Sequence, residues 1–304
     1  MTQMISPVLV IIFNRPEKVK KLIKALSLVK PTQIYISADG PRKHIPSDMV
    51  NCAKAREYAQ LIDWPCNIHT NFLDENVGVD LGMEEAMNWF YANVDEGIIC
   101  EDDCIPNPDF FTFCSTLLER YRYDEKVMLI SGTNFQDGIV RGSGSYYFSN
   151  YPTWGYAMWK RTWDKFDSNL DGLEDFVKYN KIDTILKDPA QKKYWLNFFK
   201  KIRVKKYNFT DTRLLFSIWN NYGLTVIPNK NLVQNIGFDS EATHSVTGSK
   251  ERSINLSNLG DIKFNDTIVA DERADNYFFK KIHDVSLFKK IYNKILQHII
   301  RIIK

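Results

Sequence analysis

The stretch that most constrains the fold is an apolar run that ends in three consecutive acids. Residues 98–106 are Ile-Ile-Cys-Glu-Asp-Asp-Cys-Ile-Pro. The β-prone residues before the acids predict a buried strand, so the carboxylates stand where that strand ends. Adjacent carboxylates repel one another, and burying them without a counter-charge costs more than one strand stabilises. The segment is therefore either an ordinary acidic surface loop or a cation site at the edge of a sheet.

A divalent cation would make the acidic cluster favourable. Hard oxygen ligands suit Mg²⁺ or Mn²⁺, and such an ion usually also holds substrate phosphates. In open parallel sheets, ligands bind outside the carboxyl ends of the strands. The cluster therefore predicts a metal and diphosphate site at that edge.

Strands and helices alternate along the first part of the chain. Residues 8–13 form an uninterrupted apolar run, which predicts a strand covered on both faces. Pro16 opens a predicted helix over 17–28. Further strands are predicted at 33–37, 67–72, 97–100 and 127–132, and further helices at 47–60, 78–91 and 109–123. This alternation predicts an α/β, doubly wound arrangement with right-handed crossovers.

The rest of the chain is less regular. Residues 134–151 are rich in Gly, Ser and aromatic residues, which predicts loop and hairpin. The apolar spacing predicts helices at 156–167 and 211–221, and a late strand at 224–228. Residues 237–265 are polar and predict a flexible loop region.

Composition limits the class of protein. The 304 residues are 44% hydrophobic and 25% charged, which is ordinary for one large domain or two closely packed ones. A net charge of +3 is too small to indicate a nucleic-acid partner. Five cysteines, an odd number without a Cys-x-x-Cys pair, favour reduced thiols in a cytosol. The apolar run at 8–13 is too short for a signal peptide or a membrane span.

The tail has a pattern of its own. Over 286–304, apolar residues recur at helical spacing and basic residues occupy the other face. Two interpretations stand: a helix packed on its own domain or a partner, or an interfacial helix on the anionic inner face of the plasma membrane. We therefore expect a cytoplasmic protein, with peripheral membrane attachment as the second interpretation.

Six motifs occur in a familiar order: Pro-Val-Leu-Val-Ile-Ile-Phe-Asn-Arg (7–15), Ser-Ala-Asp-Gly (37–40), Glu-Asp-Asp-Cys-Ile-Pro-Asn-Pro-Asp-Phe-Phe (101–111), Pro-Thr-Trp-Gly-Tyr-Ala-Met-Trp (152–159), Asp-Thr-Arg (211–213) and Asn-Ile-Gly-Phe-Asp-Ser-Glu-Ala-Thr-His (235–244). Together they resemble the GT-A nucleotide-sugar glycosyltransferases, in particular the inverting N-acetylglucosaminyltransferase I family and bacterial family 2-like transferases. The resemblance covers residues 7–245. It implies a Rossmann-like nucleotide-diphospho-sugar transferase fold, with a mixed, mainly parallel sheet flanked by helices.

The resemblance also implies a domain layout. A catalytic domain would span 1–279, with a nucleotide-binding half over about 1–133 and an acceptor half over about 134–279. A basic amphipathic helix would follow at 280–304. Residues 138–208 have no clear counterpart in the family, so the acceptor stays open.

The resemblance gives the acids separate roles. Asp103 would bind Mn²⁺ or Mg²⁺, Asp102 would reach the ribose or the donor sugar, and Glu101 would accept from a donor-sugar hydroxyl. Asp211 would be the general base that takes the acceptor proton. A helix N-cap is the alternative for Asp211.

Other residues would contact the substrates. Asp39 would accept from the uracil imide and so select uridine, or else serve as a turn residue. Arg15 and Asn76 would touch the nucleoside, although both also suit the start of a helix. Arg213 and His244 would touch the diphosphate or the metal, with a surface histidine as the alternative. The sugar-side loop would consist of Trp154, Gly155 and Tyr156.

These expectations predict a metal-dependent, inverting glycosyltransferase. Its partners would be a UDP-sugar donor and a glycan or lipid-linked glycan acceptor in bacterial polysaccharide or glycoconjugate synthesis. One alternative is a sugar-nucleotidyltransferase, although residues 13–16 lack the Gly-rich loop usual in that class. A membrane-docked, glycan-binding scaffold without catalysis is the other.

Overall fold

The computed structural model describes residues 4–205, 209–237 and 255–283. The first half alternates strands and helices as predicted, with bounds within a few residues of those expected. Its elements are β1 (Val8–Ile12), α1 (Pro16–Leu26), β2 (Gln33–Ala38), α2 (Pro46–Ala59), β3 (Asn67–Phe72), α3 (Val79–Tyr91), β4 (Glu96–Glu101), β5 (Cys104–Pro106), α4 (Pro108–Arg120) and β6 (Val127–Ser131).

The second half mixes short strands with helices. Its elements are β7 (Tyr146–Ser149), β8 (Tyr156–Trp159), α5 (Lys160–Trp163), α6 (Leu173–Lys178), α7 (Ile182–Ile185), α8 (Pro189–Arg203), α9 (Thr210–Asn220), β9 (Leu224–Pro228), β10 (Val233–Asn235) and α10 (Glu272–His283). Helices α6–α8 and α10 were not predicted. Their local patterns are shorter or less regular than those of the first half.

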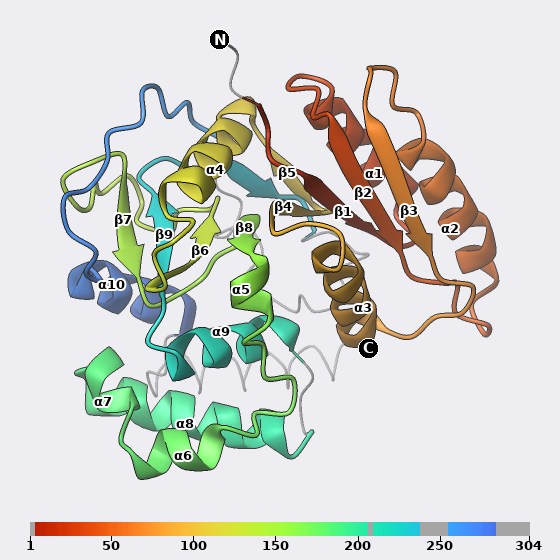
Figure 1. The fold of residues 1–304 in the computed structure, drawn as a ribbon. Helices are drawn as coiled ribbons and strands as arrows, with labels where there is room; N and C mark the ends of the chain where they lie inside the picture. Colours follow the sequence, from red (N-terminus) through yellow and green to blue (C-terminus); the bar gives the residue numbers. More distant parts are fainter. Residues whose placement is uncertain (1–3, 206–208, 238–254, 284–304) are drawn as a thin grey trace, which may run out of the picture.

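One eight-stranded sheet joins both halves, in the order β3-β2-β1-β4-β8-β6-β9-β7 (Figure 1). Strands β3, β2, β1 and β4 are parallel. Strand β8 is antiparallel to both of its neighbours, β4 and β6, and β7 is antiparallel to β9. Since parallel strands share one carboxyl edge, the loops after β1, β2 and β4 meet there.

The apolar run at the start of the chain packs on both faces of the sheet. Val8 and Val10 belong to a core cluster with residues of α1, α2 and α4, whereas Leu9 belongs to a second cluster with residues of α3, α8 and α9. Successive side chains of a strand point to opposite faces, so an unbroken apolar run is what a doubly covered strand requires.

The prediction of a helix over 156–167 is wrong at its start. Residues Tyr156–Trp159 form β8, and a helix begins only at Lys160. Ala157 and Trp159 pack in one core cluster while Tyr156 and Met158 pack in the other, which is a period of two. Four apolar residues are too few to distinguish this period from that of a helix, so the sheet neighbours decided the outcome.

The predicted fold class is confirmed: a mixed, mainly parallel sheet lies between helices. The tail at 286–304 lies outside the described residues, as does His244, so both expectations stay predictions. The division near residue 133 also stays a prediction, and the main sheet runs across it. Within the described part of the chain, no helix has the length and apolar character needed to cross a bilayer.

Candidate functional site

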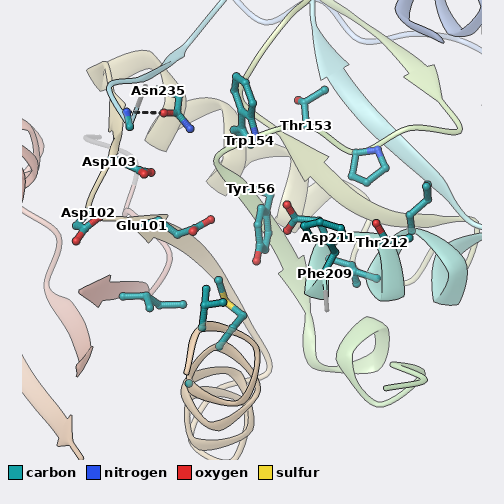
Figure 2. Close-up of a pocket in the computed structure, with 18 of the residues that line it drawn as sticks. Glu101, Asp102, Asp103, Thr153, Trp154, Tyr156, Phe209, Asp211, Thr212 and Asn235 are labelled. Atoms are coloured by element: carbon teal, nitrogen blue, oxygen red, sulfur yellow. Dashed lines mark hydrogen bonds between the residues drawn. The ribbon is translucent and has the colours of Figure 1, made fainter. Parts of the chain in front are cut away.

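A cavity of about 790 Å³ opens at the carboxyl ends of β1, β2 and β4 (Figure 2). One end of it is charged and is lined by Arg15, Asp39 and the three acids. The other end is lined by aromatic residues of the second half, from β8, α8, α10 and the residue before α9. The cavity therefore brings together the predicted strand-end residues, the predicted Trp154 and Tyr156, and further aromatic residues from α8 and α10 that the sequence did not single out.

The acidic cluster has a counter-charge beside it, supplied by the turn after β1. The Arg15 guanidinium lies 2.9 Å from Asp103 Oδ2 and 3.4 Å from Asp102 Oδ1. Burial raises the pKa of Asp102 to about 6, against the lowering effect of Arg15. Burial, followed by the charges of Asp103, Asp211 and Asp102, raises the pKa of Glu101 well above its usual range. Burial and mutual repulsion thus favour the protonated forms of Glu101 and Asp102, even with Arg15 beside them.

A small two-stranded sheet fixes the turn that carries Asp103. Strand β5 pairs with β10 immediately after the acids, and the Ile236 N–H donates to the Asp103 carbonyl over 2.7 Å. The next residue, Gly237, approaches so closely that a Cβ there would lie 2.3 Å from Asp103 Oδ2. Pairing between segments about 130 residues apart therefore positions the carboxylate.

The residues present fit a divalent cation held by one protein carboxylate. Asp103 lines the cavity and offers hard oxygen atoms of the kind that Mg²⁺ and Mn²⁺ prefer. In the described ranges, no group of three His, Cys, Asp or Glu residues is arranged to hold a metal ion. A cation at Asp103 would accordingly complete its coordination with phosphate and water oxygens, and it would relieve the repulsion among the acids.

Asp211 lies across the cavity from the acidic turn, beside Tyr156 (Figure 2). The residue before it, Thr210, is held by α3: Asp80 Oδ1 accepts from the Thr210 N–H over 3.0 Å and from its hydroxyl over 2.8 Å. The charge of Asp211 contributes to the raised pKa of Glu101, so the two carboxylates are close enough to repel each other within the cavity. Asp211 stands in the first turn of α9 and is not its N-cap, which is Phe209.

Asp39 has a structural role that extends beyond the turn predicted as its alternative. Its carboxylate accepts hydrogen bonds from the N–H groups of Gly40, Val77 and Gly78 and from the Asn76 amide, at 2.7–3.1 Å. A carboxylate has about four acceptor positions. In Asp39 these acceptor positions are filled, so the carboxylate orders the start of α3. It has little remaining capacity to accept a hydrogen bond from a nucleobase. Asn76 serves the same turn, and the N-cap of α3 is Gly78.

Two predicted residues are not among those that line the cavity. Arg213 donates to Glu84 of α3 over 3.0 Å and is buried between the two helices. Gly155 has φ +62°, and a Cβ there would lie 2.7 Å from Val233, so it allows the loop to pass close to β10. Its neighbours Trp154 and Tyr156 do line the cavity.

Sequence reasoning missed a network beside the charged end. Asp48 of α2 accepts from Arg42 Nε over 2.6 Å and from the Asn14 amide over 2.7 Å. These hydrogen bonds lower the pKa of Asp48 to about 2, with the Arg42 bond contributing most. The Arg42 guanidinium lies 5.4 Å from the Phe13 ring centre, and both residues line the cavity. The only local sequence feature that pointed to Asp48 was its place in a Pro-Ser-Asp segment typical of a helix start.

No protein-family model matches the chain, and no curated protein matches it. Among solved structures, the chain is similar to 4-diphosphocytidyl-2C-methyl-D-erythritol synthase from Anaerococcus prevotii, with 12% identity and a TM-score of 0.38 over 73% of this chain and 88% of that one. It is also similar to HddC from Yersinia pseudotuberculosis, with 12% identity and a TM-score of 0.29 over 51% of this chain and 78% of that one. Similarity of this degree concerns the fold.

These findings contradict the predicted function. We expected sugar transfer from a UDP-sugar to a glycan acceptor, yet neither matched protein is named as a glycosyltransferase, and the first is named for a diphosphocytidyl product.

Proposed function

We propose that the cavity binds a nucleoside triphosphate with a divalent cation and that the protein is a sugar-nucleotidyltransferase. The observation that supports this most is the charged end itself. Three acids at the end of β4 and Arg15, the N-cap of α1, line one cavity, with an Arg15–Asp103 distance of 2.9 Å. Carboxylates that bind a cation beside a guanidinium form a site for polyphosphate.

Arg15 supplies the contact that a Gly-rich loop makes in other enzymes of this class. The turn after β1 has no such loop, but a guanidinium can donate two parallel hydrogen bonds to phosphate oxygens. A cation held by Asp103 would compete with Arg15 for that carboxylate. Arg15 would then be available to the phosphate groups in the same cavity.

The second substrate in this proposal is a sugar phosphate. One of its phosphate oxygens attacks the α-phosphorus of the nucleotide, and the bond to the leaving pyrophosphate breaks. A bound cation would neutralise charge that develops on the phosphates. The attacking phosphate is already anionic and needs no general base. Asp211 and Glu101 would accordingly accept hydrogen bonds from sugar hydroxyls and orient the substrate.

The test is calorimetric titration of the protein with UTP, CTP, GTP and ATP, each with and without Mg²⁺ or Mn²⁺. One nucleotide should bind in a cation-dependent manner, and Asp103→Asn and Arg15→Gln should each weaken it. A pyrophosphate-release assay with a panel of sugar 1-phosphates then measures transfer. Including UTP beside CTP also tests the predicted preference for uridine.

Lys43→Ala is the control, since Lys43 forms an exposed ion pair with Glu75 outside the cavity lining. The proposal fails if no triphosphate binds, or if binding is the same in Asp103→Asn as in the unaltered protein.

A further inference from the structure

The far end of the cavity is lined mainly by flat rings. Tyr194 and Phe198 of α8, Phe209 before α9 and Phe278 of α10 all line it and are half-buried. We call these four residues the aromatic chamber. None of them belongs to the motifs found in the sequence, and the triphosphate at the charged end does not require them.

The rings of the aromatic chamber form an ordered surface. Tyr194 and Phe198 stack with ring centres 5.9 Å apart and 21° between their planes. Phe198 and Phe209 continue the row at 6.2 Å and 26°. Phe278 lies 5.1 Å from the buried Tyr151, tilted by 36°. The three rings from Tyr194 to Phe209 are therefore nearly parallel to one another, unlike the edge-to-face contacts that dominate the interior of this protein.

Polar groups stand at the border of the chamber. Asp211 and Thr212 lie toward the acids, and the Tyr194 hydroxyl lies 3.2 Å from His283 Nδ1 at the other side. Few charged groups line this end, so a phosphate placed there would lose hydration without a partner. Aromatic faces with a few hydroxyl and carboxylate groups suit a ligand with apolar C–H faces and hydroxyl edges.

We infer that the aromatic chamber binds an additional sugar ring by stacking, so that the substrate of this cavity is a glycosyl phosphate of at least two rings. The first ring would lie near Glu101 and Asp211, and the next would lie against the row from Tyr194 to Phe209. This inference rests on the proposed function only for the placement of the reacting phosphate. The size of the cavity, about 790 Å³, is in the upper part of the range of roughly 300–1,000 Å³ for ligand sites.

Saturation-transfer NMR on the full chain tests this inference. The probes are glucose, as a single ring, and a set of disaccharides: maltose, cellobiose, lactose and N,N′-diacetylchitobiose. 1-Hexanol serves as an aliphatic comparison. We expect ring C–H protons of at least one disaccharide to receive saturation on both rings.

Leucine variants distinguish stacking of a sugar on an aromatic ring from simple contact with an apolar side chain. Phe198→Leu and Phe278→Leu keep an apolar side chain but remove the flat face, so the disaccharide should bind about fivefold more weakly. Phe264→Leu is the matched control, because Phe264 is 40% exposed and does not line the cavity. Thermal unfolding of each variant shows whether the fold is retained.

Several results would overturn the inference: no saturation of any disaccharide, saturation by 1-hexanol alone, or equal disaccharide binding in folded Phe198→Leu and Phe278→Leu proteins. The proposed function has its own readout in nucleotide titration. Nucleotide binding without saccharide contact would refute only the inference that the aromatic chamber binds a sugar ring. Saccharide contact without nucleotide binding would refute the proposed nucleotidyltransferase function but would still support a sugar-binding site.

Discussion

The two ends of the cavity are built by different means. The charged end consists of loops at the carboxyl edge of parallel strands, each fixed by hydrogen bonds such as those from the start of α3 to Asp39. The aromatic end consists of helices α8, α9 and α10 (Figure 1). Ring packing holds α8 to α9 and to α10. The difference shows that, in one cavity, directional hydrogen bonds can position charged groups while non-directional ring packing maintains the shape of the wall. Substitutions at the two ends should therefore have different effects on the protein.

The largest effect should come from the carboxylate at the charged end. Asp103→Asn keeps the size of the side chain but removes the charge that would hold the cation. Cation-dependent stabilisation of developing charge is worth several kcal/mol, so turnover should fall by about 100-fold or more. Pyrophosphate release measures this. Unchanged turnover in Asp103→Asn would show that the charged end is not where catalysis occurs.

The next effect concerns the contact between the halves. Arg213 on α9 pairs with Glu84 on α3, with side chains 10% and 19% exposed. Removing one partner leaves a charge enclosed, so Arg213→Leu should lower the free energy of unfolding by about 3 kcal/mol. Urea denaturation checks this.

The exposed Lys43–Glu75 pair is the comparison, with side chains 79% and 69% exposed. Lys43→Ala should change stability by less than about 1 kcal/mol. Equal effects in the two variants would mean that burial does not distinguish the two ion pairs.

Asp48 should stabilise the fold in a pH-dependent manner. Its pKa is lowered from 3.8 to about 2, chiefly by the Arg42 hydrogen bond. The stabilisation is therefore present above about pH 4 and is lost as the pH falls toward 2. Asp48→Asn should cost about 2 kcal/mol at neutral pH, and much less in acid. Urea titrations across this range measure the difference, and a cost independent of pH would contradict the ionic role.

Asp275 of α10 should show the opposite sign, with a somewhat smaller effect. Burial raises its pKa from 3.8 to about 6, although Ser149 and Asn150 donate hydrogen bonds to it. The folded state then binds a proton more readily than the unfolded chain. The contribution of this group to stability should rise by about 1–2 kcal/mol as the pH falls from 7 to about 4. Asp275→Asn should remove that rise. If the variant and the unaltered protein keep the same pH profile, the raised pKa is wrong.

The sequence predicted the parallel half well because each element there carries its own signal. The unbroken apolar run of β1 and the alternation up to β6 do not depend on distant neighbours. The second half was predicted less well, since β8 is a strand only because β4 and β6 flank it. Helices α6, α8 and α10 likewise gain stability from one another, through ring contacts of α8 with α6 and with α10 that no local spacing revealed.

For the site, the sequence by itself determined which acids stand at a strand end and that Arg15 ends the first strand. Local apolar pattern suffices for this, because carboxyl ends of parallel strands meet at one edge. Tertiary structure alone decided that Asp39 orders α3, that Arg213 pairs with Glu84 and that aromatic side chains from α8 and α10 complete the cavity. Those outcomes depend on contacts between segments 40 to 130 residues apart, for which a chain carries no local signal.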